Sequence, residues 1–158
     1  MEITIRQATT DDFEAICSLF NEIDALHREN LPHIFQKPNG PTREYDYYLE
    51  LMADETVGLF IAEMEEILVG FVHAKIRDTS TIPLFVPRCY AMVDSIVVNS
   101  VYQHHGIGKK LMNAMQEWAI AKGATFIELN VYEFNESAKS FYERLGYTTI
   151  SRRMRKEL

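Results

Sequence analysis

The strongest constraint on the fold is a stretch, residues 92–112, in which a strand pattern turns through glycines directly into a helix pattern. Its first half is apolar and β-branched, which is typical of a buried strand. Its second half repeats apolar side chains every three or four residues, which predicts an amphipathic helix. The helical positions are Ile107, Leu111, Ala114, Met115 and Trp118.

Gly106 and Gly108 lie where the strand pattern gives way to the helix pattern. The first N–H groups of a helix lack intrahelical partners and carry partial positive charge, so a glycine turn there can wrap a phosphate with its main chain. Two nucleotide motifs are excluded. A P-loop needs glycine at position 103 and Ser or Thr at 110, which are Gln103 and Lys110; a dinucleotide fingerprint needs a third glycine at 111, which is leucine.

The composition is that of a globular chain with one core. Its 158 residues are 47% hydrophobic and 25% charged, so we expect a single domain over residues 1–158. No apolar run approaches the roughly 18 residues of a membrane span, and the first residues resemble neither a signal nor a transit peptide. A cytoplasmic location with no membrane partner is therefore expected.

The net charge of −7 argues against nucleic acid as a partner and suits a cationic substrate such as an amine. The two cysteines, Cys17 and Cys89, are too few and too far apart to predict a disulfide framework or a zinc site. We expect them to be small apolar residues in or near the core, and we expect no metal.

Periodicity along the chain predicts the element order β-α-α-β-β-β-α-β-α-β. This is an α/β fold with a mixed sheet: the front half is antiparallel, one β-α-β unit follows it, and helices cover both faces. The expected strands are 2–8, 58–64, 67–76, 90–98, 125–131 and 147–157, and the expected helices are 10–27, 42–54, 106–122 and 135–145.

Four local expectations accompany this order. Thr10 should cap the first helix, and a tight turn at Glu65 and Glu66 should join the hairpin strands. Gly70 should mark a bulge or a close backbone approach. The proline-rich segment 31–41 should be a loop whose apolar residues either cap the core or line a substrate pocket.

Two motifs resemble those of a known family. The segment Gln103–Gly108 reads Q-x-x-G-x-G and resembles the acetyl-CoA pyrophosphate motif of the GCN5-related N-acetyltransferase (GNAT) family. The segment Asn135–Tyr147 matches N-x-x-A-x-x-F-Y-x-x-x-G-Y and looks like the second hallmark of that family. Because two motifs in the family's order are more specific than one, we identify a resemblance to the GNAT family from about Ile3 to Met154.

The resemblance implies a single-domain GNAT-like acyl-CoA N-acyltransferase fold and an acetyl-CoA-dependent N-acetyltransferase. The acetyl group would pass to a primary amine of a small molecule or peptide by direct attack in a ternary complex. Many family members pair as dimers, so a homodimer is a further expectation. A different class of function, a non-catalytic acyl-CoA-binding regulatory module, remains the alternative.

The resemblance also implies roles for particular residues. The backbone of Ile96, Val97 and Val98 should pair with the pantetheine amides, with the Val98 N–H facing the thioester carbonyl. Asn135 should hold the pantetheine arm or the start of the helix near it, and Tyr142 is the candidate general acid. The pyrophosphate should be held by Gln103, His104, His105, Gly106, Ile107, Gly108 and Lys109, largely through main-chain N–H groups.

Acetyl transfer needs a neutral amine, yet an alkyl amine of pKa ~10.4 is only about 0.1% neutral at pH 7, so a base or a water chain helps. Asp94 is the first candidate, because a two-residue period puts it on the strand face of Ile96 and Val98. Glu133 is the rival, and a water-mediated route without a dedicated base is the third choice. His104 and His105 lie in the expected phosphate-binding turn, so we expect their side chains to contact the bound ligand or to be exposed to solvent rather than to act as bases.

The acceptor amine is not identified by the sequence. By family resemblance its pocket is formed by residues 24–48 and 79–88, which are rich in aromatic and acidic side chains. His27 and His33 lie in this region, where surface or capping roles are expected to outweigh catalysis. These stretches suit a small cationic amine or a peptide amine without choosing between them.

Overall fold

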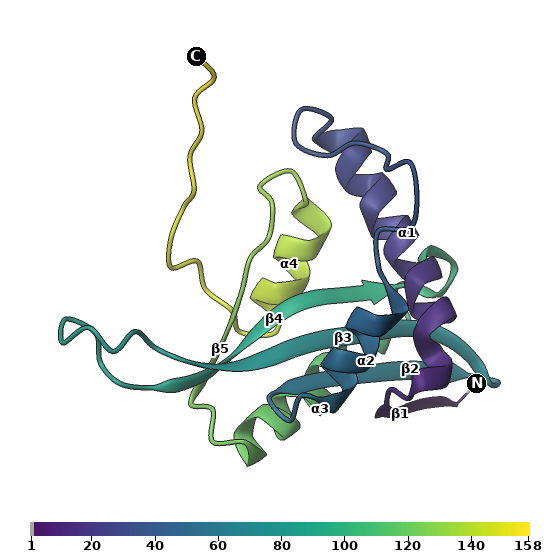
Figure 1. Cartoon of the computed structure of the whole chain (residues 1–158), viewed down its shortest axis with the longest axis horizontal. Helices are drawn as coiled ribbons and strands as arrows, with labels where there is room; N and C mark the ends of the chain where they lie inside the picture. Colours follow the sequence, from purple (N-terminus) through teal and green to yellow (C-terminus); the bar gives the residue numbers. More distant parts are fainter. Residues whose placement is uncertain (1) are drawn as a thin grey trace.

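A computed structural model describes residues 2–158 and contains one five-stranded sheet with the strands in the order β1-β2-β3-β4-β5 (Figure 1). Neighbours are antiparallel from β1 to β4, and β4 pairs with β5 in parallel. This arrangement confirms the expected mixed sheet. The strands are β1 (Ile3–Gln7), β2 (Val57–Met64), β3 (Ile67–Asp78), β4 (Cys89–Val98) and β5 (Phe126–Leu129).

Four helices accompany the sheet, and none of those in the described part of the chain is long and apolar enough to cross a membrane. Two short 3₁₀ turns precede α1 and follow β4. The helices are α1 (Phe13–Asn30), α2 (Tyr45–Ala53), α3 (Ile107–Ala121) and α4 (Glu136–Arg144), and the 3₁₀ turns are η1 (Thr10–Asp12) and η2 (Ser100–Tyr102).

The two faces of the sheet bury separate apolar clusters, as expected for helices on both sides (Figure 1). On one face α1 and α2 cover the sheet, and Ile16 and Leu19 of α1 pack with Phe71 of β3. On the other face Leu111 and Met115 of α3 are fully buried. Since the chain between β4 and β5 consists mainly of α3, this β-α-β unit fixes the parallel edge of the sheet.

The β2–β3 hairpin confirms two local expectations. Its turn consists of Glu65 and Glu66, both with positive φ (52° and 65°), the geometry of a tight hairpin turn. The register then shifts between Ala62 and Glu63, opposite the segment next to Gly70. A Cβ on Gly70 would lie 2.9 Å from the Val97 carbonyl oxygen, so glycine lets β3 and β4 approach closely there.

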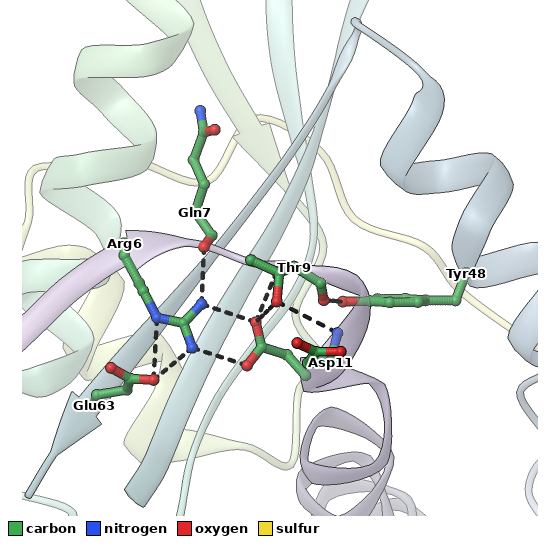
Figure 2. Close-up of polar contacts among 7 residues, drawn as sticks. Arg6, Gln7, Thr9, Asp11, Tyr48 and Glu63 are labelled. Atoms are coloured by element: carbon green, nitrogen blue, oxygen red, sulfur yellow. Dashed lines mark hydrogen bonds and ion pairs between the residues drawn. The ribbon is translucent and has the colours of Figure 1, made fainter. Parts of the chain in front are cut away.

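The side-chain cap lies one residue earlier than expected and belongs to the 3₁₀ turn η1 that leads into α1, whereas α1 itself begins without a side-chain cap. Thr9, rather than Thr10, is the cap: its side chain accepts from the Asp11 N–H, and Asp12 reaches back to the Thr9 N–H in a capping box. Figure 2 shows that this turn is tied to the sheet, because Arg6 donates two hydrogen bonds of 2.9 Å to Asp12 and also pairs with Glu63. The Tyr48 hydroxyl of α2 donates to the Thr9 carbonyl.

The chain after Gly146 differs from the expectation of a final strand. Residues 147–158 are extended but pair with no strand of the described chain, and they lead away from the sheet to the C-terminus (Figure 1). The physical reason lies in the exit turn. Gly146 has φ of 95° and the Tyr147 N–H donates to the Tyr142 carbonyl, which closes α4 and directs the chain outward.

The Arg6 cluster generates a test of fold stability. Replacing Arg6 by Met leaves the buried Asp12 carboxylate without its bidentate partner, so we expect the free energy of unfolding to fall by about 1–3 kcal/mol at pH 7. Arg6 lowers the pKa of Asp12, so this contribution is present above the unfolded pKa and is lost as pH falls through the folded pKa. Urea denaturation at decreasing pH should show that the difference in the free energy of unfolding between wild type and Arg6→Met becomes smaller. Lys37→Met, on an exposed loop, is the control and should change little.

Candidate active site

The candidate site lies where β4 and β5 part. The parallel ladder joins Tyr90–Val93 to Phe126–Leu129 and then ends, although β4 continues to Val98. On the β5 side, residues 94–98 therefore have no strand partner in the described chain. The main-chain N–H and C=O groups on that side, apart from the Val98 carbonyl, which accepts from Gln103, are available to an extended ligand with amide groups, in the way that a peptide adds to a sheet edge.

A β-bulge occurs at the same point. On β3, His73 pairs with Ser95 and Ala74 pairs with Val93, so Asp94 is the extra residue. The bulge reverses the alternation of side chains along β4. Ile96 and Val98 pack on the α3 side of the sheet, whereas Asp94 lines a pocket on the α1 and α2 side. The expectation that Asp94 shares a face with Ile96 and Val98 is therefore wrong.

The pocket beside Asp94 has a volume of about 430 Å³ and is enclosed by α1, α2 and the sheet. Its apolar wall includes Phe13, Phe20 and Tyr48. Charged groups of both signs also line it: Asp94 and Glu44 are acidic, and Arg43, Lys75 and Arg77 are basic. Arg43 is already neutralised, because it pairs with Asp24 at 2.7 Å and stacks on the Phe20 ring.

His73 is a site residue that sequence reasoning missed. Its side chain is only 14% exposed, its Nδ1 lies 3.9 Å from Asp94 Oδ2, and its Nε2 is buried with no hydrogen-bond partner in the described chain. Burial lowers its pKa, with Asp94 opposing and Lys75 reinforcing the shift. The available signal was a histidine that directly follows the apolar run 67–72 of β3.

The glycine turn follows β4 as expected. Gln103 donates from Nε2 to the Val98 carbonyl at 3.1 Å, which ties the turn to the end of the strand. The His105 Nδ1 lies 2.8 Å from the Gln103 carbonyl and so stays within the turn. His104 and Gly106 both have positive φ, 67° and 78°, and Gly106 caps α3.

The start of α3 is held by burial and by a close contact. Ile107 is 1% exposed, whereas Lys109 is exposed at the helix start. A Cβ on Gly108 would lie 3.1 Å from the Phe141 ring, so this glycine lets α4 pack against the first turn of α3. The two motifs found in the sequence thus meet in space at Gly108 and Phe141.

On α4, Asn135 is the helix cap, with its side-chain oxygen accepting from the Ala138 N–H at 3.1 Å. Tyr142 is largely buried, and burial raises its pKa to about 12. Its ring contacts Phe141 on one side and Tyr147 on the other. Since the phenol keeps its proton at neutral pH, Tyr142 can serve as a hydrogen-bond donor.

The remaining predicted residues do not line the pocket of Asp94. Glu133 is 78% exposed and lies 3.7 Å from Lys139. His27 stacks on Phe35 and contacts Tyr132, so the proline-rich loop is joined to the segment after β5. His33 is exposed. In the described part of the chain, no three His, Cys, Asp or Glu side chains are grouped so as to hold a metal ion.

Two curated relatives match most of this chain. An N-acetyltransferase of Methanocaldococcus jannaschii, MJ1207, is 30% identical over 144 residues, which are 91% of this chain and 60% of the relative. The chain thus spans less than two thirds of that protein. The N-acetyltransferase YhfO of Bacillus subtilis is 30% identical over 145 residues, covering 92% of this chain and 89% of the relative. Both relatives are themselves uncharacterised.

Solved structures share the fold along nearly the whole chain. A mutant of the BH1408 protein from Bacillus halodurans superposes with a TM-score of 0.92 at 25% identity, covering 98% of this chain and 99% of that one. The aminoglycoside acetyltransferase AAC(6')-Iy, solved with a bisubstrate analogue containing CoA, superposes with a TM-score of 0.77 at 19% identity and covers 100% of this chain and 99% of that one.

The family comparison agrees with the relatives. A family model described as the acetyltransferase (GNAT) family matches residues 20–147, which include the glycine turn, the bulged strand and the helix of Tyr142. This chain belongs to the GNAT acetyltransferase family.

Proposed function

We propose that this protein is an N-acetyltransferase that moves the acetyl group of acetyl-CoA to a primary amine of a small molecule or peptide, by direct attack in a ternary complex. One observation carries the proposal. The unpaired edge of β4 runs from Asp94 to Val98, between the glycine turn at one end and the pocket of Asp94 at the other. Family membership supports acetyl transfer as the reaction.

The cosubstrate would lie along this edge. The main chain of Ile96, Val97 and Val98 would pair with the pantetheine amides, with the Val98 N–H facing the thioester carbonyl. The pyrophosphate would be bound by the turn from Gln103 to Lys109, where free N–H groups of the α3 start and positive φ values form an anion-binding concavity. Asn135 uses its side chain as a helix cap, so its role would be to fix the start of α4 beside the pantetheine.

Tyr142 would assist the departure of the CoA thiolate. An unperturbed thiol has a pKa of about 8.5, so full proton transfer from a phenol of pKa about 12 is uphill. A hydrogen bond from the phenol to the developing thiolate is still favourable in a buried site, because charge-assisted hydrogen bonds are strong there. Tyr142 therefore stabilises the leaving thiolate by donating this hydrogen bond, and complete transfer of its proton to the sulfur stays uphill by the difference between the two pKa values.

Asp94 would take the proton of the attacking amine. It lines the pocket, and its position on the bulge places it at the end of the free edge. His73 lies beside it with a lowered pKa, so a neutral imidazole is available next to the carboxylate. Glu133 is a weaker candidate because it is exposed and paired with Lys139. A water chain into the pocket is the third route.

The acceptor would occupy the pocket beside Asp94. Its aromatic wall suits the flat or aliphatic part of an acceptor molecule, and the carboxylates of Asp94 and Glu44 suit its amine. An acetyltransferase of the same fold is named for aminoglycosides, so aminoglycosides are one group of candidate acceptors to assay. Peptides and small amines are the other two groups.

The test of this function is release of free CoA thiol from acetyl-CoA over a panel of amines, alongside calorimetric binding of acetyl-CoA. We expect binding, and thiol release that depends on at least one amine, peptide or aminoglycoside. Binding without thiol release from any of them would instead establish the alternative class, a non-catalytic acyl-CoA-binding module.

Tyr142→Phe tests the proposed acid. We expect turnover to fall by about 10²-fold or more, the usual contribution of a positioned acid, with the acetyl-CoA dissociation constant nearly unchanged. Tyr90→Phe is the matched control, because Tyr90 stacks on Phe126 within the paired part of β4. Equal turnover of Tyr142→Phe and wild type at pH 7 would remove the phenol from the mechanism.

His73→Gln tests the electrostatics of the pocket through stability. The pKa of His73 is lowered in the folded state, so the unfolded state binds more protons below about pH 6.5 and the free energy of unfolding falls as pH decreases through that range. His27, whose pKa burial also lowers, adds to this loss. Urea denaturation at about pH 7.5 and pH 5 should show that the free energy of unfolding decreases less between these two values in His73→Gln than in wild type. The exposed control His33→Gln should lose as much free energy of unfolding between the two pH values as wild type does. An equal loss in His73→Gln and wild type would contradict the lowered pKa of His73.

A further inference from the structure

The pocket beside Asp94 holds positive side chains that an amine alone does not explain. Its lining contains two carboxylates, Asp94 and Glu44, and three cations, Arg43, Lys75 and Arg77. A protonated amine is attracted to the carboxylates and repelled by the cations. The acceptor therefore needs an anionic group of its own, unless other side chains of this chain neutralise the cations.

One of the three cations is neutralised within the chain. Arg43 donates two hydrogen bonds to the Asp24 carboxylate of α1, at 2.7 and 3.2 Å. Its guanidinium also lies over the Phe20 ring, 3.6 Å from the ring centroid. Because its charge is balanced and its flat face is covered, Arg43 is part of the pocket wall rather than a group that is free to bind an anion.

Lys75 and Arg77 are not paired in this way. The Lys75 Nζ lies 3.6 Å from Oδ2 of Asp54, beyond hydrogen-bond distance, while the other oxygen of that carboxylate accepts from the N–H and the hydroxyl of Thr56. The Arg77 side chain is exposed and makes no hydrogen bond or ion pair within the described chain. Two cations of the pocket are thus available to an anion.

These two cations lie in a row with His73 on β3. Side chains two residues apart on a strand share a face, so positions 73, 75 and 77 all line the pocket. His73 contacts Asp94 at 3.9 Å, and each further step of two residues along a strand covers about 7 Å. A lysine side chain is long and flexible enough to cover much of that step. A small molecule can therefore contact Asp94 and Lys75 at the same time.

The wall between the charged groups is apolar. Phe13, Ile16 and Phe20 of α1 and Leu59 of β2 line it, and Ile16 and Leu59 are buried. The volume of about 430 Å³ suits a small molecule. A ligand with an amine, a carboxylate and an apolar side chain complements all three parts of this lining.

We propose that the acceptor is a small amino-carboxylate with an apolar side chain, an amino acid or a dipeptide, whose amine lies at Asp94 and whose carboxylate lies at Lys75 and Arg77. This inference rests on the proposed acetyl transfer and names its substrate class. Polyamines and aminoglycosides are disfavoured, because their further positive charges would lie against Lys75 and Arg77.

The chemistry of the transfer is unchanged by this choice. The amine nitrogen forms a bond to the acetyl carbon, the carbon–sulfur bond of the thioester breaks, and CoA leaves as the thiolate. The proton of the amine passes to Asp94. Lys75 and Arg77 contact no reacting atom, so they determine specificity and take no part in the bond changes.

The first experiment compares matched acceptors in the thiol-release assay. One series is phenylalanine, phenylalaninamide and phenethylamine, and the second is leucine, leucinamide and isopentylamine. We expect kcat/KM to be about 10- to 100-fold higher for the amino acid than for its two analogues, the contribution of a hydrogen bond to a charged group. The amides have less basic amines, so a larger neutral fraction of the amine cannot explain a preference for the amino acids. Spermidine should be a poorer acceptor than either amino acid.

The outcomes separate this proposal from the proposed function. Thiol release that is as fast with the analogues or with spermidine as with the amino acids overturns the proposal and leaves acetyl transfer standing. Absence of thiol release with every amine overturns acetyl transfer. In that case calorimetry in the presence of CoA decides the recognition: binding of phenylalanine or leucine, with weaker binding of phenethylamine and isopentylamine, supports it, and equal or absent binding overturns it.

Lys75→Gln and Arg77→Gln test the two cations. We expect the ratio of kcat/KM for phenylalanine to kcat/KM for phenethylamine to fall by about 10-fold in each, mainly through a higher KM for phenylalanine. Because the ratio compares two acceptors on the same protein, any loss of folded protein cancels. Lys122→Gln removes the same charge from the exposed end of α3 and should keep the wild-type ratio. An unchanged ratio in both pocket variants overturns the proposal.

Discussion

The structure depends on a single event in β4, the bulge at Asp94, which coincides with the end of the ladder to β5 after Val93. A bulge bends its strand and strengthens the local twist, so β4 turns away from β5 at that point. Two consequences follow from the same extra residue. The main chain of 94–98 has an unpaired edge, and beyond the bulge Ile96 and Val98 return to the α3 face while Asp94 lies on the pocket face. The unpaired edge of β4 and the pocket beside Asp94 therefore meet at one irregularity of the sheet.

Two glycines, Gly70 and Gly108, allow neighbouring elements to pack closely around β4 and the turn that follows it. Gly70 permits β3 to lie against the Val97 carbonyl just beyond the bulge, and Gly108 permits the Phe141 ring of α4 to pack on the start of α3. The glycine turn and the helix of Tyr142 lie far apart in sequence, and this second contact brings them together. Substitution at Gly108 would thus act on the distance between the glycine turn and the Tyr142 phenol, although this glycine is not itself a reactive group.

The sequence predicted most of the fold and the elements of the site, and its failures have physical causes. Periodicity located the strands and helices because each has one apolar face, and the family motifs located the turn and Tyr142. The face of Asp94 was predicted wrongly because a two-residue period cannot register an inserted residue, which only pairing with β3 defines. His73 was missed because its importance arises from a neighbour on the adjacent strand. The final strand was predicted from correct local alternation, but a strand also needs a partner, and none lies within the described chain.

The end of α4 and the proposed acid are mechanically connected. Tyr147 belongs to the exit turn of α4: its N–H donates to the Tyr142 carbonyl, and its ring contacts the Tyr142 ring, whose burial raises the pKa of the phenol to about 12. Opening of this turn would admit water to the Tyr142 ring and remove the cause of the raised pKa. The turn after α4 therefore holds the phenol in position without contributing any atom to the reaction, so its effect on Tyr142 is one of orientation rather than of chemistry.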